Sequence, residues 1–392
     1  MEKIKLKKVA TKRVKEGYPL LVKGDFLSEP KLNDGSFVEL VDDQKQFVAR
    51  GYLATQNKGD GWVLTTNPKE LLEQSFFEGL FLKAEKARNT LKLDESTTAF
   101  RFFNGEGDGL GGLTIDYYAD YYVFSWYSEG IYKHHSVILK AFQAVIKNCL
   151  GIYQKFRYDV KGKEYSSHIA GEIAPTPLII LENGIQYATY LDDGLMTGIF
   201  LDQREVRETI RENYSMGKTV LNTFSYTGAF SVAAAMGGAS ETTSVDLANR
   251  SLPKTKEQFE VNGISADTQR VLVMDVFDYF KYALKKNLSY DTVIIDPPSF
   301  ARSKKRTFSV AKDYQKLLEE VISITNHNGV IVASTNAANV TMEKFEGFIR
   351  KAFENSHEKY TLLEKYSLPS DFKLNPHFPE GDYLKVCILR KK

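Results

Sequence analysis

The first 65 or so residues of the chain alternate apolar and polar side chains over short runs. Alternation with a period of two predicts β-strands, and the Gly, Asp and Asn residues between the runs predict turns. The pattern therefore predicts a small β-barrel-like module over residues 1–68. Its strands are expected within residues 3–9, 19–24, 36–42, 46–55 and 61–66.

A second pattern follows, in which apolar positions recur at helical spacing from Pro68 to about Leu91. Residues 100–128 then have the pattern of a hairpin, and a helix, a strand and a final hairpin are predicted after it. This mixture predicts an α+β middle domain over residues 69–185. The later elements are expected at residues 134–149, 151–160 and 177–192.

From about residue 200, strands and helices alternate to the end of the chain. This order is typical of an α/β fold with a doubly wound, mostly parallel sheet. We therefore predict a third domain over residues 186–392, with helices in the intervals between its strands. The predicted strands are residues 218–224, 241–247, 268–275, 290–296, 329–335 and 383–389.

The composition of this 392-residue chain is that of a soluble protein with several domains, and its formal net charge of +2 gives a weak average field. Affinity for nucleic acid must then come from local basic segments, of which residues 1–24 and 301–316 are two. The two cysteines, Cys149 and Cys387, favour a reducing compartment, and the six histidines show no ligand spacing. We expect a cytoplasmic protein without a membrane segment or a metal site.

The stretch DTVIIDPPSF, residues 291–300, ends a predicted buried strand on an acid and two prolines. Four β-branched residues suit a strand that is covered on both faces. Asp296, Pro297 and Pro298 can neither continue that strand nor start a helix at once. The strand is therefore predicted to end in a rigid corner.

Acidic residues follow three successive strands of the predicted sheet, at Asp246, Asp275 and Asp296. In such sheets, ligands bind beyond the carboxyl ends of the strands. Gly228 allows close backbone approach after the first strand, but the loop is not G-x-G-x-x-G, so a nicotinamide dinucleotide is poorly supported. Asp246 is suited to ribose hydroxyls, and Asp275 to an adenine amino group. Each acid alone could be a helix cap, but the ordered set predicts a nucleoside cofactor.

Residues 197–205 (TGIFLDQRE), 222–246 (NTFSYTGAFSVAAAMGGASETTSVD) and 296–300 (DPPSF) carry a family resemblance. In order and spacing they resemble the class I S-adenosylmethionine methyltransferases that modify large-subunit ribosomal RNA. The N-terminal part resembles a PUA domain, and residues 101–116 resemble the middle domain of the cytosine-C5 methyltransferases of 23S rRNA. The resemblance implies a Rossmann-like domain with a seven-stranded sheet and S-adenosylmethionine as cofactor. The implied partner is 23S rRNA or a ribosomal assembly particle. The oligomeric state is left open, and a homodimer is one alternative.

Carried over to this sequence, the resemblance implies three groups of site residues. The cofactor-binding residues are Phe200, Asp202, Gln203, Phe224, Tyr226, Gly228, Asp246, Asp275 and Asp296. The catalytic residues are Asp296, Pro297, Pro298, Ser299, Phe300 and Asn336, among which Asp296 would accept from a base amino group and Phe300 would stack on an extruded base. The residues expected to meet RNA phosphates are Arg302, Lys304, Lys305 and Arg306.

One departure from the family concerns the reaction itself. Cytosine-C5 enzymes add a cysteine thiolate to C6 of the base, and the two places for that cysteine are here Ser299 and Asn336. The domain order alone therefore supports cytosine C5 as the methylated atom. Guanine N7 is an alternative target, because it needs no covalent adduct and because Ser334-Thr335-Asn336 and the run at 371–375 resemble guanine-N7 enzymes. A ribosome-assembly factor with altered catalysis is the third alternative.

Overall fold

The computed structural model describes residues 1–392 except residues 32, 57–58, 163 and 303–306. The chain divides into two compact units by its internal contacts. The first unit consists of Met1–Ile180, Thr189–Thr197 and Ser370–Gly381, and the second of Leu181–Ala188, Gly198–Pro369 and Asp382–Lys392. The predicted three-part division, with boundaries near 68 and 185, stays a prediction. In the described part of the chain, no helix is long and apolar enough to cross a membrane.

The N-terminal part of the first unit is a five-stranded sheet in the order β1-β3-β4-β5-β2. Its strands are β1 (Glu2–Lys5), β2 (Leu20–Leu21), β3 (Phe37–Val41), β4 (Phe47–Leu53) and β5 (Gly61–Thr65). The predicted strand at 3–9 is shorter than expected, because helix α1 (Lys8–Lys15) follows β1 directly. Ala10 and Val14, four positions apart, lie on the buried face of α1 and pack into the core of this module. Period-two alternation alone did not reveal this short helix.

The rest of the first unit is an α+β arrangement built on a sheet in the order β10-β9-β8-β7-β6. Helices α2 and α5 contact each other, and an aromatic core links this sheet to Tyr52 and Trp62 of β4 and β5. The strands are β6 (Ala99–Asn104), β7 (Leu113–Tyr118), β8 (Tyr121–Trp126), β9 (Gly151–Phe156) and β10 (Ser166–Gly171). The helices are α2 (Gln74–Ala87), α3 (Asn89–Lys92), α4 (Glu129–Tyr132) and α5 (His135–Val145). Of these elements, β10 and the one-turn helix α4 were not expected from the sequence.

The segment Ser370–Gly381 belongs to the first unit although it lies near the C-terminus of the sequence. The Asp371 carboxylate accepts from the Arg101 backbone N–H at 2.8 Å, and the Asp371 carbonyl accepts from Arg88 at 2.7 Å. Arg88 is buried and forms two further bonds of 2.7 and 2.6 Å to the Asp108 carboxylate. The 371–375 run, which the sequence linked to guanine-N7 enzymes, therefore fastens this segment within the first unit.

The second unit is built on a seven-stranded sheet in the order β15-β14-β13-β16-β19-β21-β20. All pairings are parallel except those of β21, which is antiparallel to both of its neighbours. The strands are β13 (Thr219–Thr223), β14 (Glu241–Asp246), β15 (Arg270–Val273), β16 (Tyr290–Ile295), β19 (Thr325–Thr335), β20 (Tyr360–Tyr366) and β21 (Lys385–Lys391). The predicted doubly wound sheet is confirmed. Strand β20 lies in an interval that was expected to hold only a helix.

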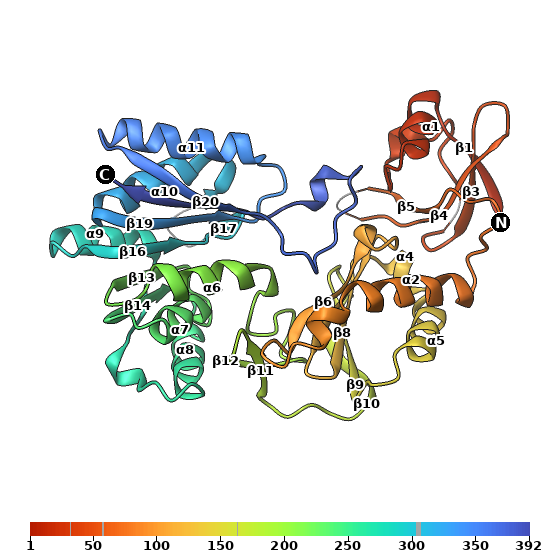
Figure 1. The fold of residues 1–392 in the computed structure, drawn as a ribbon. Coiled ribbons are helices and arrows are strands. Elements are labelled where there is room, and N and C mark those ends of the chain that lie inside the picture. The colour runs from red at the N-terminus through yellow and green to blue at the C-terminus, as the bar shows by residue number, and fades with distance from the viewer. Residues whose placement is uncertain (32, 57–58, 163, 303–306) are drawn as a thin grey trace. The chain divides into compact units, whose positions relative to one another are not determined.

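Helices cover both faces of this sheet (Figure 1). Neighbouring strand residues alternate between two cores: Val293 and Ile295 pack with α9, α10 and α11, whereas Ile294 packs with α6 and α7. Strands that are covered on both faces carry near-continuous apolar runs, as β16 does at Val293–Ile295. The helices are α6 (Arg204–Asn213), α7 (Ala229–Met236), α8 (Ser251–Glu260), α9 (Val276–Lys285), α10 (Val310–Ser323) and α11 (Met342–Asn355). Two hairpins lie outside these sheets: β11 (Leu178–Glu182) pairs with β12 (Ile185–Thr189), and β17 (Phe300–Arg302) pairs with β18 (Thr307–Ser309).

Candidate active site

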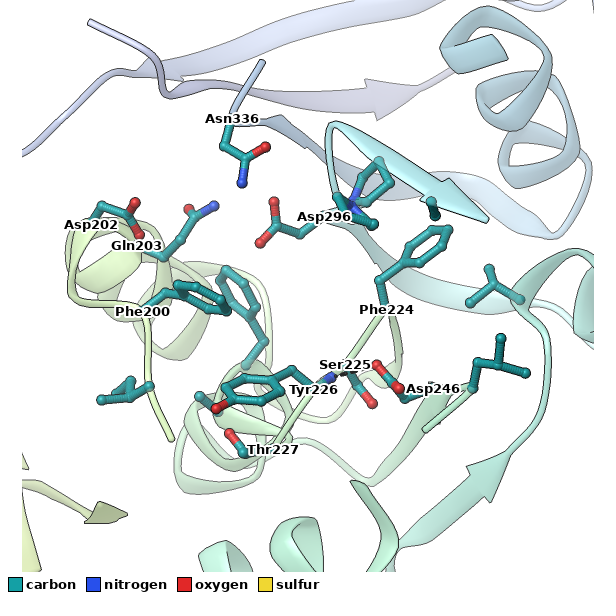
Figure 2. Close-up of a pocket in the computed structure, with 18 of the residues that line it drawn as sticks. Phe200, Asp202, Gln203, Phe224, Ser225, Tyr226, Thr227, Asp246, Asp296 and Asn336 are labelled. Atoms are coloured by element: carbon teal, nitrogen blue, oxygen red, sulfur yellow. Dashed lines mark hydrogen bonds between the residues drawn. The ribbon is translucent and has the colours of Figure 1, made fainter. Parts of the chain in front are cut away.

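A cavity of about 350 Å³ lies in the second unit, beside the carboxyl ends of β13, β14, β16 and β19 (Figure 2). Its position follows from the topology, because the carboxyl ends of parallel strands meet at one edge of the sheet. The loops after these strands bring together residues that are more than a hundred positions apart. The predicted site residues that line the cavity are Phe200, Asp202, Gln203, Phe224, Tyr226, Asp246, Asp275, Asp296, Pro297, Pro298 and Asn336.

The loop after β13, residues 224–228, has an unusual backbone. Phe224 and Tyr226 have φ values of 54° and 53°, in the left-handed region that large side chains rarely adopt. Gly228 follows with a φ of 79° and is the N-cap of α7. A Cβ at Gly228 would lie 2.4 Å from Thr255 Cγ2. Strain of this kind persists where the surroundings impose it, and it is concentrated at functional sites.

Asp246, the last residue of β14, is fixed by two backbone donors. One carboxylate oxygen accepts from the Tyr226 N–H at 2.9 Å and the other from the Ala248 N–H at 2.8 Å. The first of these bonds joins the 224–228 loop to the end of the neighbouring strand. Each carboxylate oxygen retains acceptor capacity toward the cavity, because an oxygen can accept two bonds.

Asp275 is the N-cap of α9, and its carboxylate accepts from the N–H groups of Phe277 and Asp278 at 3.0 and 3.3 Å. This is the capping role that the sequence left open for any single acid in the series. Asp275 nevertheless also lines the cavity, beside Val276 and Phe277. The cap therefore fixes its carboxyl group at the cavity wall.

A buried ion pair fixes the position of the turn that precedes α6. Arg207 donates to both oxygens of Glu182 at 2.7 Å and to the Phe200 carbonyl at 2.7 Å. Both side chains of the pair are about 3% exposed. The Phe200 ring lies 5.4 Å from the Tyr226 ring, and both rings face the cavity (Figure 2). Arg207 thus positions one aromatic wall of the site.

Asp296 directly follows β16 and lies in a polar cluster that lines the cavity. Gln203 donates from its amide to the Ser334 hydroxyl at 2.9 Å, and both side chains are hydrogen-bonded to Asp296. Burial raises the pKa of Asp296 to about 6; nearby Asp202 adds to this rise, whereas Ser334, Arg207 and Gln203 oppose it. The Gln203 carbonyl oxygen is buried without a hydrogen-bond partner among the described residues. An unsatisfied buried acceptor beside a cavity is suited to a donor on a ligand.

The two positions that replace the family's cysteines are in contact. The Ser299 hydroxyl donates to the Asn336 side-chain carbonyl at 2.6 Å. Asn336 lines the cavity, whereas Ser299 and Phe300 are exposed beyond it in β16's corner and β17. The Phe300 side chain is 62% exposed, so its face is open to a partner.

Part of the expected RNA-binding run lies outside the described residues, namely Lys304, Lys305 and Arg306. Arg302 ends strand β17, which pairs with β18 in a short hairpin that begins at Phe300. The phosphate-binding role of this run stays a prediction.

Several cavity residues were not expected from the sequence. Arg207 lies one helical turn after Arg204 on the same face of α6, and this spacing was the signal available for it. Phe277 follows the Asp275 cap, and Phe308 comes from β18. Gly228 was expected in the cavity wall, but among the described residues it is Ser225, Thr227 and Ala229 that line the cavity beside it.

The cavity suits S-adenosylmethionine in its donor set and shape. Aromatic and apolar walls flank it, the fixed Asp246 carboxylate can accept from ribose hydroxyls, and the Asp275 carboxylate at the cavity wall can accept from an amino group. The orphaned Gln203 oxygen and the Asp296 carboxylate are acceptors, and they can receive an ammonium or stabilise a positive sulfonium centre.

Comparison with known proteins decides the family. Residues 137–373, more than half of the chain, match the model of the S-adenosylmethionine-dependent methyltransferases. The chain belongs to this family. It is therefore a methyltransferase that uses S-adenosylmethionine, and residues 4–66 match the model of the PUA-like domain.

Two relatives and one solved structure show how far this similarity extends. YwbD of Bacillus subtilis, named "Putative ribosomal RNA large subunit methyltransferase", is 53% identical, with 100% of both chains covered. Ribosomal RNA large subunit methyltransferase I of Aeromonas salmonicida is 30% identical over 92% of this chain and 91% of its own. The solved structure described as "Crystal structure of SMU.776, a putative methyltransferase complexed with SAH" has 46% identity and a TM-score of 0.93, with 100% of both chains covered.

Proposed function

We propose that this methyltransferase modifies a base of large-subunit 23S ribosomal RNA, and that the base atom is guanine N7. The rRNA substrate is supported by the names of the two relatives and by the N-terminal PUA-like domain. The roles of Arg302, Lys304, Lys305 and Arg306 in phosphate binding belong to this proposal.

The observation that carries the choice of atom is the chemistry at the two cysteine positions. Ser299 and Asn336 bond to each other there, and neither side chain forms an anion near neutral pH without a strong base. The two thiols of the chain lie elsewhere: Cys387 is fully buried in β21, and Cys149 belongs to the first unit. Burial raises the pKa of Cys149 to about 11 and that of Cys387 to about 12. The geometry therefore offers no support for the cytosine-C5 adduct.

Guanine N7 needs no adduct, because it already carries a lone pair. When bound, S-adenosylmethionine supplies a methyl group on a positively charged sulfur. The N7 lone pair forms the new N–CH₃ bond while the S–CH₃ bond breaks and its electron pair stays on sulfur, so the positive charge passes to the purine. No proton has to leave, and the site must only orient the base and exclude water.

The residues of the chain divide this work between them. Asp246, Asp275 and Gln203 would hold the cofactor, and the walls at Phe200 and Tyr226 would exclude water. Asp296, ionised above its pKa of about 6, would face the positive charge as it passes from sulfur to base. Phe300, exposed in the corner, would stack on the extruded base.

The test is mass spectrometry of digested nucleosides, after incubation with labelled S-adenosylmethionine and rRNA from a strain that lacks the gene. The proposal expects labelled 7-methylguanosine. Labelled 5-methylcytidine would overturn the choice of atom while leaving the rRNA substrate intact. Retained cofactor binding with no labelled nucleoside in rRNA or ribosomal particles would overturn the activity itself and favour an assembly factor.

A further inference from the structure

The contact between Ser299 and Asn336 sets the direction of an amide at the cavity edge. An asparagine side chain has an acceptor oxygen and a donor nitrogen, and which of them faces a ligand depends on their other partners. Here the Ser299 hydroxyl donates to the amide oxygen at 2.6 Å, so the oxygen is engaged outside the cavity. Figure 2 shows the amide nitrogen of Asn336 on the side toward Asp296 and Gln203.

The two residues come from neighbouring strands, so their contact is built into the sheet. Strands β16 and β19 pair in parallel, with Ile295 opposite Ala333. Ser299 and Asn336 follow these partners in the two adjoining corners, and Pro297 and Pro298 limit the movement of the first corner. Nearby Asp296 and the partnerless Gln203 oxygen are acceptors, which further favours the nitrogen over the oxygen on that side of the Asn336 amide.

We propose that Ser299 is a positioning residue that holds the Asn336 amide with an N–H directed at the target base, and that this N–H selects a carbonyl oxygen next to the methylated atom. This inference rests on the proposed function. In guanine, O6 lies beside N7 on the same edge and accepts hydrogen bonds, whereas adenine presents an amino donor there. Asn336 is then the residue that determines the specificity for guanine.

The cost of a wrong base follows from this geometry. An amino group facing the Asn336 N–H would leave two donors without an acceptor in a site from which the base has displaced water. Discrimination by one such contact is about 10- to 100-fold. If Ser299 loses its hydroxyl, the amide can rotate and present either atom, so part of the rate and part of the selectivity are lost together.

The experiment compares four variants on rRNA from a strain that lacks the gene, with kcat, KM for rRNA and the labelled nucleoside as readouts. Ser299→Ala is expected to lower kcat/KM for rRNA about 5- to 10-fold, the effect of one neutral hydrogen bond. Ser299→Thr, which keeps the hydroxyl, is expected to restore the rate. Asn336→Asp, which offers only acceptors, is expected to lower kcat/KM by more than about 100-fold. Ser265→Ala, at an exposed serine of the same unit, is the matched control and should behave as wild type.

Binding of S-adenosylhomocysteine, measured by calorimetry on each variant, separates this role from damage to the fold or the cofactor site, and it is expected to stay within about twofold. The inference is overturned if Ser299→Ala retains the full rate, if Ser299→Thr is as slow as Ser299→Ala, or if Asn336→Asp still methylates guanosine efficiently. Failure of the proposed function has a different signature, since the wild-type protein would then yield a nucleoside other than 7-methylguanosine.

Discussion

The backbone N–H of Tyr226 donates to the Asp246 carboxylate at 2.9 Å. This bond joins the left-handed 224–228 loop to the end of the adjacent strand, and the same carboxylate is held at its other oxygen by Ala248. The acid predicted to bind ribose therefore also holds the loop whose residues Phe224, Tyr226 and Gly228 were predicted to bind the cofactor. Ribose binding and the position of the 224–228 loop, which the sequence placed in separate motifs, therefore both depend on the Asp246 side chain.

Replacing Asp246 should weaken cofactor binding for both reasons at once. Hydrogen bonds to a charged group contribute about 1.5–3 kcal/mol, so Asp246→Ala is expected to weaken S-adenosylhomocysteine binding roughly 10- to 100-fold in calorimetric titration. Asp267→Ala, at an exposed aspartate that does not line the cavity, is the matched control. Unchanged affinity in Asp246→Ala would contradict the assignment of this residue to the cofactor.

The activity should fall in mild acid. The pKa of Asp296 is raised to about 6 by burial, so its carboxylate is ionised at pH 7.5 and becomes protonated as the pH drops below 6. Loss of the negative charge removes stabilisation from the positive centre, and kcat/KM, which reports the free enzyme, should decline along a single titration with an apparent pKa near 6. The measurement is the rate of methyl transfer to rRNA between pH 5 and 8.

Asp296→Asn provides the control for this pH dependence. The amide keeps the size of the side chain but does not titrate, so the variant should be slower at pH 7.5 and should lose the inflection near 6. An inflection that persists in Asp296→Asn belongs to another group. The raised pKa also predicts how stability depends on pH. Because the folded state binds the Asp296 proton more tightly than the unfolded chain does, the contribution of this group to the free energy of unfolding increases as the pH falls through 6 toward 4.

The strained loop makes its own prediction at Gly228. Gly228→Ala would place a Cβ 2.4 Å from Thr255 at a φ of 79°, whereas Gly263→Ala at a φ of 69° meets nothing within 4 Å. Both variants force alanine into the left-handed region, at a cost of roughly 1–2 kcal/mol. Only Gly228→Ala adds a clash, so thermal unfolding should occur at a clearly lower temperature in Gly228→Ala than in Gly263→Ala. Equal unfolding midpoints would mean that the Thr255 side chain moves away from the added Cβ without a measurable loss of stability.

The sequence predicted the second unit better than the details of its site. Strands covered on both faces carry runs of apolar residues, and an acid after each of three strands is visible without coordinates, so the fold and 11 of the 23 residues that line the cavity could be named in advance. Strand β20, in which polar residues interrupt the apolar ones, gave no such signal. The Arg207–Glu182 pair joins residues 25 positions apart, and nothing local to either residue predicts that contact.

The capping role of Asp275 and the direction of the Asn336 amide show a second limit. Residue type indicates that a carboxylate or an amide is present, but its hydrogen-bond partners determine what it offers to a ligand. Likewise, the run from Asp371 to Asn375 resembled a functional motif, yet its contacts fasten a segment of the first unit. A motif that comprises only a few residues does not distinguish these alternatives.

The cysteines give a direct test of the chemistry. Because neither thiol lines the described cavity, a protein carrying both Cys149→Ser and Cys387→Ala should keep methyl transfer to rRNA within about threefold of wild type. Cys387 is packed in the core, so its truncation should cost about 1 kcal/mol of stability without changing the product. Activity is therefore compared per folded protein at 20 °C. Loss of activity in the folded double variant would indicate that a thiol takes part in catalysis and would support a covalent mechanism.

The buried ion pair of the first unit should be costly to break. Arg88 and Asp108 are 2% and 3% exposed at the side chain, and Arg88 also donates to the Asp371 carbonyl. Asp108→Ala leaves a buried guanidinium without its carboxylate, which is expected to destabilise the first unit by about 3–5 kcal/mol. The exposed pair of Lys23 and Glu29 in the same unit offers the matched control, because Glu29→Ala should change stability by less than about 1 kcal/mol. Urea denaturation of both variants measures the difference, and similar midpoints would mean that the contacts of Asp371 hold the segment without this pair.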